Sequence, residues 1–109
     1  MTTQPITTEQ MLADLSSAFP RMWKKPLCDF DRRYAGGVWT GQDTRNSMPD
    51  GEPMFAWVIE GVADRVHPGF VAWLSARRWY AEAWDTETWF LLPEFAWADD
   101  VVLAKPMHA

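Results

Sequence analysis

Residues 77–97, RRWYAEAWDTETWFLLPEFAW, decide the fold because they contain the clearest pair of strands in the chain. Seven of these residues are aromatic, and four of the seven are Trp. The segments WYAEAW and WFLLPE have the composition of two strands, and DTET between them is a polar turn. We therefore expect a β-hairpin in which Trp84 lies opposite Trp89, a register that a two-residue and a four-residue loop share.

Alternation of side chains divides this hairpin into two faces. The face expected to contact the core carries two small residues between large apolar ones: Trp79, Ala81, Ala83, Phe90 and Leu92. The other face carries Tyr80, Glu82, Trp84, Trp89, Leu91 and Pro93. Because Glu82 interrupts this second face, we expect partial exposure there. The sequence leaves open whether the C-terminal tail covers it.

Two helices are expected before the hairpin. Thr7 and Gln10 have the spacing of a capping box, so a first helix should begin at Thr8 and end just before Pro20. Pro68 suits the first position of a second, short helix.

Further strands are expected between the helices. MFAWVIEG, residues 54–61, is apolar on both faces and predicts a central strand. Residues 36–41 predict a short strand, and residues 28–34 a charged, half-exposed one. The chain is thus predicted to be a single α+β domain over residues 1–109, with an antiparallel sheet of about three to five strands. Residues 1–6 and 106–109 are expected to be flexible.

Charge is concentrated in the hairpin region. The chain carries a net charge of −5, and residues 79–109 hold six acidic groups against Lys105 alone, which also gives −5. Such a segment repels polyanions, so direct binding of nucleic acid or of an anionic membrane surface is disfavoured there. A protein with a basic surface would instead be attracted.

Compartment signals are few. Cys28 is the single cysteine, which excludes an internal disulfide and favours a reducing compartment. The first ten residues, MTTQPITTEQ, have neither the basic nor the apolar region of a secretion signal. No apolar run approaches the roughly 18 to 20 residues that span a bilayer. We expect a cytoplasmic protein.

Reactive side chains are sparse and carry no established pattern. Cys28 is interpreted as a small buried hydrophobe, and Asp29 with Asp31 as part of a charged strand beside two arginines. His67, with Asp64 as a possible orienting carboxylate, is interpreted as a histidine bonding backbone at a helix start. No ligand cluster for a metal and no phosphate-binding loop is present in the sequence, so no cofactor is expected.

Two hypotheses for function remain. The first is a small, acidic, non-enzymatic protein-binding module, an inhibitor or adaptor of the kind encoded by phages or mobile elements. It would act on a basic, nucleic-acid-handling protein, or pair with a second copy as a homodimer. The residues expected at this interface are Tyr80, Glu82, Trp84, Asp85, Glu87, Trp89, Trp97, Asp99 and Asp100. The alternative is a small enzyme or small-molecule-binding protein with a pocket between sheet and helix near His67.

Overall fold

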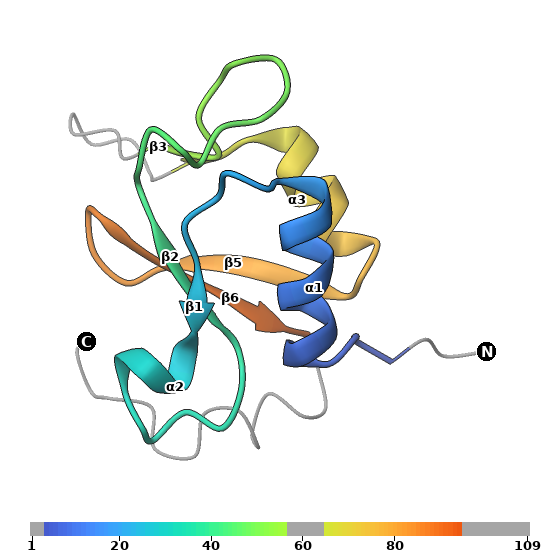
Figure 1. Cartoon of the computed structure of the whole chain (residues 1–109), viewed down its shortest axis with the longest axis vertical. Coiled ribbons are helices and arrows are strands. Elements are labelled where there is room, and N and C mark those ends of the chain that lie inside the picture. Colours follow the sequence, from blue (N-terminus) through green and yellow to red (C-terminus); the bar gives the residue numbers. More distant parts are fainter. Residues whose placement is uncertain (1–3, 57–64, 95–109) are drawn as a thin grey trace.

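A computed structural model describes residues 4–56 and 65–94 (Figure 1). They form a small α+β domain built around a four-stranded antiparallel sheet, as the sequence predicts. The helices are α1 (Thr8–Ala18), α2 (Leu27–Phe30) and α3 (Pro68–Ser75). The strands are β1 (Lys25–Pro26), β2 (Val38–Gly41), β3 (Phe55–Ala56), β4 (Arg65–Val66), β5 (Trp79–Ala83) and β6 (Thr88–Pro93).

The main sheet has the strand order β1-β2-β6-β5, and β3 pairs only with β4 in a separate small sheet. The prediction of a central strand over residues 54–61 is therefore wrong for its described part, because Phe55–Ala56 stands apart from the main sheet. The rest of that segment lies outside the described residues. The strand expected over residues 28–34 is also wrong. Leu27–Phe30 is one helical turn, closed by the Asp31 amide, which donates to the Leu27 carbonyl at 3.1 Å.

The N-terminal helix begins and ends where its sequence predicts. The Thr7 hydroxyl accepts a hydrogen bond from the Gln10 amide at 3.1 Å, which caps the first turn of α1. Met11 and Leu15 are fully buried on its inner side. The segment before the helix is attached to the sheet, since the Trp79 indole Nε1 donates to the Ile6 carbonyl at 2.8 Å.

Helix α3 begins at Pro68, and Arg77 ties its end to the first helix. The Arg77 guanidinium lies 3.7 Å from the centroid of the Trp73 ring and donates from Nε to Asp14 of α1 at 3.0 Å. This contact joins α1 and α3 on one side of the sheet. Arg78, which follows, has φ of 63°, a left-handed conformation that lets the chain turn directly into β5.

The register of the hairpin differs from the prediction by one residue. Ala83 lies opposite Trp89, and the Trp84 amide donates to the Thr88 carbonyl at 2.9 Å. The Asp85 carboxylate accepts from the amides of Glu87 and Thr88 at 2.9 and 2.8 Å. It thereby closes a three-residue turn, residues 85–87, between the paired Trp84 and Thr88.

This shift exchanges the two faces of β6, because a slip of one residue turns every side chain of a strand to the other side. Trp89 and Leu91 now share a face with Trp79, Ala81 and Ala83, and α1 and α3 cover that face. The main core lies in this layer, and its most buried members are Met11, Leu15, Val38, Met54, Phe70, Leu74, Trp79, Trp89 and Leu91. The predicted core face of β5 is confirmed, whereas that of β6 is wrong.

Candidate interaction surface

The second face of the sheet carries a cluster of aromatic rings around Phe30 of α2. Its ring centroid lies 5.2 Å from that of Trp39, 5.5 Å from that of Trp84 and 5.2 Å from that of Phe90, in edge-to-face arrangements. Phe90 is buried beneath the other rings at 4% exposure, while Phe30, Trp39 and Trp84 are half-buried. We call these four residues the aromatic face.

The aromatic face is supported from below by a second, smaller hydrophobic cluster. Leu27, Tyr34, Phe90 and Leu92 are buried together, and the three half-buried rings pack against them. The Tyr34 hydroxyl finds no hydrogen-bond partner among the residues that the structure describes. Burial therefore raises the pKa of Tyr34 above its ordinary value, with a further contribution from the charge of Asp31.

Trp23 extends the row of rings toward β1, at 5.1 Å from Trp39 in an edge-to-face contact. Both indoles line a hollow of about 200 Å³ between the end of β2 and the hairpin turn. Asp43 and Glu87 are the two acidic residues that line it. Gly41 is required among its lining residues, because a Cβ there would clash with the Glu87 carbonyl oxygen of the hairpin.

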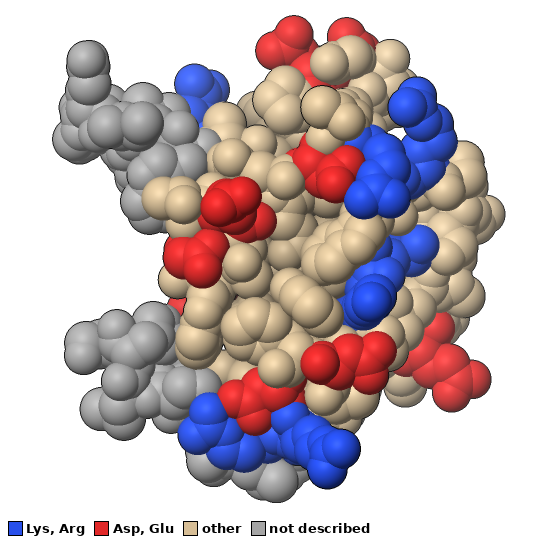
Figure 2. Space-filling model, turned by 60° about the vertical axis from the view of Figure 1, so that its left-hand side comes forward, with Lys and Arg blue, Asp and Glu red and all other residues tan. Residues whose placement is uncertain are grey.

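Charge is not uniform around the rings. Lys25 Nζ lies 5.9 Å from the centroid of Trp39, within the range of a cation–π contact, whereas Asp85 and Glu87 are exposed at the hairpin turn. Seen from the side of the hairpin turn, the middle of the surface is uncharged, and both acidic and basic side chains lie around it (Figure 2). Asp85 and Glu87 thus make the hairpin end of this surface acidic.

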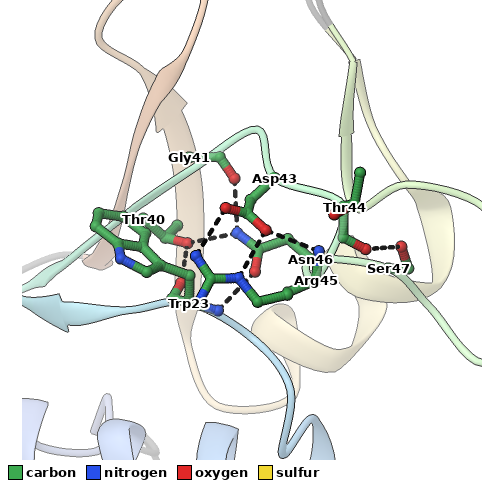
Figure 3. Close-up of polar contacts among 8 residues, drawn as sticks. All are labelled: Trp23, Thr40, Gly41, Asp43, Thr44, Arg45, Asn46 and Ser47. Carbon is green, nitrogen blue, oxygen red and sulfur yellow. Dashed lines mark hydrogen bonds and ion pairs between the residues drawn. The ribbon is translucent and has the colours of Figure 1, made fainter.

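A buried polar network positions Trp23 beside this hollow (Figure 3). Asn46 is 1% exposed; its carbonyl oxygen accepts from the Trp23 amide at 2.7 Å, and its amide donates to Thr40 Oγ1 and the Gly41 carbonyl at 2.9 and 2.6 Å. Thr40 in turn donates to the Trp23 carbonyl at 2.6 Å. Every polar atom of the Asn46 side chain is therefore used to hold the segment before β1 against β2 and the following loop.

An ion pair fixes the start of the same loop. Arg45 donates from Nε and Nη2 to the two carboxylate oxygens of Asp43, each at 2.8 Å. These hydrogen bonds, with that of the Arg45 amide, hold the pKa of Asp43 well below its usual range. Asp43 is thus an anion already paired with Arg45, and Glu87 is the other acid beside the two indoles.

The structure brings together most of the interface residues that the sequence predicts. Tyr80 and Glu82 lie on the same side of β5 as Trp84, with Tyr80 exposed and Glu82 half-buried, and Asp85 and Glu87 lie at the adjoining turn. The prediction is wrong for Trp89, which is 2% exposed in the main core. Its ring stacks on that of Phe55, with 4.8 Å between the ring centroids. Trp97, Asp99 and Asp100 lie outside the described residues.

Sequence reasoning missed Trp23, Phe30 and Trp39 as members of this surface. They come from the segment before β1, from α2 and from β2, and they meet the hairpin because β2 pairs with β6. Nothing local in the sequence indicates this pairing. The sequence does predict a Trp-containing strand over residues 36–41, but it does not indicate with which other strand this one pairs.

The alternative site was expected as a pocket between the sheet and α3 near His67, but that layer is packed with side chains and the hollow near His67 lies elsewhere. The layer between the sheet and α3 is filled by the rings of Phe55, Phe70, Trp79 and Trp89. His67 lies at the start of α3, where Nδ1 accepts from the Gly69 amide at 2.9 Å and Nε2 contacts Asp50 Oδ2 at 2.8 Å. Both ring nitrogens are thus engaged, beside a hollow of about 270 Å³ whose polar walls include Glu52 and Arg65. Asp64 lies outside the described residues.

The remaining reactive side chains are separated on the surface. Cys28 is exposed on α2 rather than buried as expected. Asp31 is held by Arg33, which donates to both carboxylate oxygens, while Asp29 is exposed. Within residues 4–56 and 65–94, no three His, Cys, Asp or Glu side chains gather as a metal site would need. Over the same residues, no helix has the length and apolar character to cross a membrane.

Comparison of the chain with protein-family models, with curated proteins and with solved structures found no match.

Proposed function

We propose that this chain is a small, non-enzymatic protein-binding module whose aromatic face contacts another protein. The observation that carries the proposal is the row of half-buried rings, Trp23, Trp39, Phe30 and Trp84, on the sheet face opposite α1 and α3. Trp side chains are the commonest anchors of protein interfaces, because a large rigid area is buried at a small cost in side-chain entropy. Edge-to-face packing already holds these rings in place, which reduces that cost further.

The hollow beside the hairpin turn supports a partner with a basic surface. Trp23, one of its two indoles, can stack with an Arg or Lys side chain of a partner, whereas Trp39 already has Lys25 at 5.9 Å from its ring centroid. Glu87 at its edge supplies a carboxylate for the same cation, and Asp85 at the turn adds negative charge nearby. The partner we propose is a basic, nucleic-acid-handling protein in the cytoplasm, and the role that of an inhibitor or adaptor such as phages and mobile elements encode.

Capture from a cell lysate tests this proposal with two matched variants. Trp84 and Trp73 are both half-buried, but Trp84 belongs to the aromatic face, whereas Trp73 packs between Phe19 and Phe70 on the helical side. Trp84→Ala is expected to lose the captured protein, and Trp73→Ala to retain it. Captured proteins are identified by mass spectrometry, and circular dichroism melting verifies that both variants remain folded.

Charge provides a second readout of the same complex. Binding should weaken as salt rises, and Glu87→Gln should reduce both the affinity and its dependence on salt, because one carboxylate beside the indoles is removed. Equal capture by wild type and Trp84→Ala would refute the proposal. Absence of any captured protein, together with a rise in melting temperature on addition of a small molecule, would favour the alternative site near His67.

A further inference from the structure

His67 connects two segments of the chain, and each of its ring nitrogens contacts a different one. Nε2 lies 2.8 Å from Oδ2 of Asp50, in the loop between β2 and β3. Nδ1 accepts a hydrogen bond from the Gly69 amide at 2.9 Å, in the first turn of α3. A ring nitrogen that accepts carries no proton, so the proton of the neutral imidazole lies on Nε2 and is donated to Asp50. The neutral ring therefore bridges the loop and the helix.

The Gly69 amide depends on this ring, because no other acceptor serves it among the residues that the structure describes. Pro68 has no N–H, and the amides of Phe70 and Val71 both donate to the His67 carbonyl at 2.9 Å. The Gly69 N–H is one of the groups that a helix start leaves unsatisfied, and Nδ1 satisfies it as the side chain of an N-cap residue does.

The charges around His67 act differently on its two nitrogens. Hydrogen bonds from the Glu52 amide, and then from His67, lower the pKa of Asp50, which is therefore an anion where histidine titrates. The side chains of Glu52 and Arg65, of opposite charge, line the hollow beside the ring. Helix α3 carries no charged side chain, but the positive end of its dipole faces Nδ1. A positive ring is thus favoured on its Asp50 side and disfavoured on its helix side.

We propose that His67 is a pH-sensitive latch at the start of α3: the neutral ring holds both Asp50 and Gly69, and the protonated ring holds Asp50 alone. The second proton comes from solvent and occupies the Nδ1 lone pair that accepts from Gly69. Two N–H groups would then face each other, so the first turn separates from the ring. The bond to Asp50 persists and becomes charge-assisted. Histidine gains its second proton between about pH 8 and pH 5, so the latch opens on acidification.

The opening stays local, because the next residue anchors the helix in the core. Phe70 is fully buried, and its ring centroid lies 5.5 Å from that of Phe19 and 5.6 Å from that of Phe55. Exposing this ring would cost more than losing one hydrogen bond to an exposed glycine. Acidification therefore changes the surface at Pro68 and Gly69, beside the hollow of about 270 Å³ that His67 and Pro68 line, and leaves the core packed.

NMR titration of the full chain between about pH 8 and pH 5 tests the latch. At the alkaline end, the ring nitrogen shifts should show the tautomer with its proton on Nε2. On acidification the Gly69 amide should shift with the same midpoint as the His67 ring. The Trp79 indole N–H, which donates to Ile6 away from the latch, should stay constant.

His67→Asn is the matched variant, because its side-chain oxygen can cap the Gly69 amide and does not titrate. It also assigns the ring signals, since His108 is the other histidine of the chain. The response of Gly69 should vanish in this variant. A Gly69 amide that does not follow the ring in the wild type, or that titrates equally in His67→Asn, overturns the proposal. A neutral ring with its proton on Nδ1 also overturns it, and that measurement needs no variant.

Discussion

Ala83 lies directly opposite Trp89 across the β5–β6 hairpin, and Trp84 therefore projects to the other face of the sheet. Trp89 is buried at 2% exposure against Phe55, whereas Trp84 is half-buried beside Phe30. Two indoles on one hairpin thus have separate roles: Trp89 fills the main core, and Trp84 forms part of the aromatic face.

This division predicts unequal effects on stability. Trp89→Ala should lower the free energy of unfolding by about 3 to 5 kcal/mol, because it leaves a large cavity in the core. Trp84→Ala should lower it by about 1 to 2 kcal/mol, because part of that ring is already in contact with water. Denaturant unfolding followed by far-UV circular dichroism measures both values. Equal losses would contradict the assignment of the two rings to different faces.

The Asn46 network predicts a substitution whose effect depends on pH. Asn46→Ala should cost about 2 to 4 kcal/mol, since the buried groups of Trp23 and Gly41 lose their partner. Asn46→Asp places a carboxylate where an amide donated, and burial raises the pKa of such a group. The Asp variant should therefore gain stability as pH falls and the carboxyl becomes a donor again. An Asp variant whose stability deficit relative to the wild type does not shrink on acidification would contradict this network.

Alkaline titration examines the charge beside Tyr80. Burial, and then the charges of Glu82 and Glu94, raise the pKa of Tyr80 above its ordinary value of 10.0. Glu82→Gln should lower the pKa of Tyr80, because the Tyr80 phenolate would then no longer be repelled by the charge of Glu82. Since the folded pKa is the higher one, stability is retained below pH 10.0 and is lost as pH rises through the folded pKa. Ultraviolet absorbance of the phenolates, with Tyr80→Phe as the reference, measures the change.

Acid titration examines the turn after α2. Hydrogen bonds from the Arg33 side chain, and then from its amide, lower the pKa of Asp31 from 3.8 to about 2. The associated stability is present above pH 3.8 and is lost as pH falls toward 2. Arg33→Gln should move the Asp31 midpoint back toward 3.8, as followed by carboxyl carbon NMR. An unchanged midpoint would mean that the pair seen in the structure is not formed in solution.

Local signals in the sequence account for α1, for α3 and for the existence of the hairpin, but not for α2, where a strand was predicted. The Thr7 cap and Pro20 bound α1, and Pro68 marks the start of α3, because capping and the missing proline N–H act within a few residues. The hairpin register was missed because the Asp85 carboxylate binds two turn amides. A side-chain bond of this kind selects a three-residue turn that composition alone does not indicate.

Long-range pairing is the part that the sequence does not reveal. Phe55–Ala56 has the apolar pattern of a central strand, yet its partner is β4 rather than the main sheet. The aromatic face depends likewise on β2 lying beside β6, which brings Trp39 next to Phe90 at the centre of the sheet. Strand order follows from the packing of the whole chain, so half of the candidate surface could not be assembled from local patterns.

Oxidative footprinting of the captured complex tests the central claim most directly, namely that the aromatic face contacts a protein. Hydroxyl radicals modify accessible indoles, and Trp73 on the opposite side of the sheet serves as an internal reference. Oxidation of Trp84 and Trp39 should fall when the partner is bound, while that of Trp73 stays constant. Protection of Trp73 with no change at Trp84 and Trp39 would contradict this account.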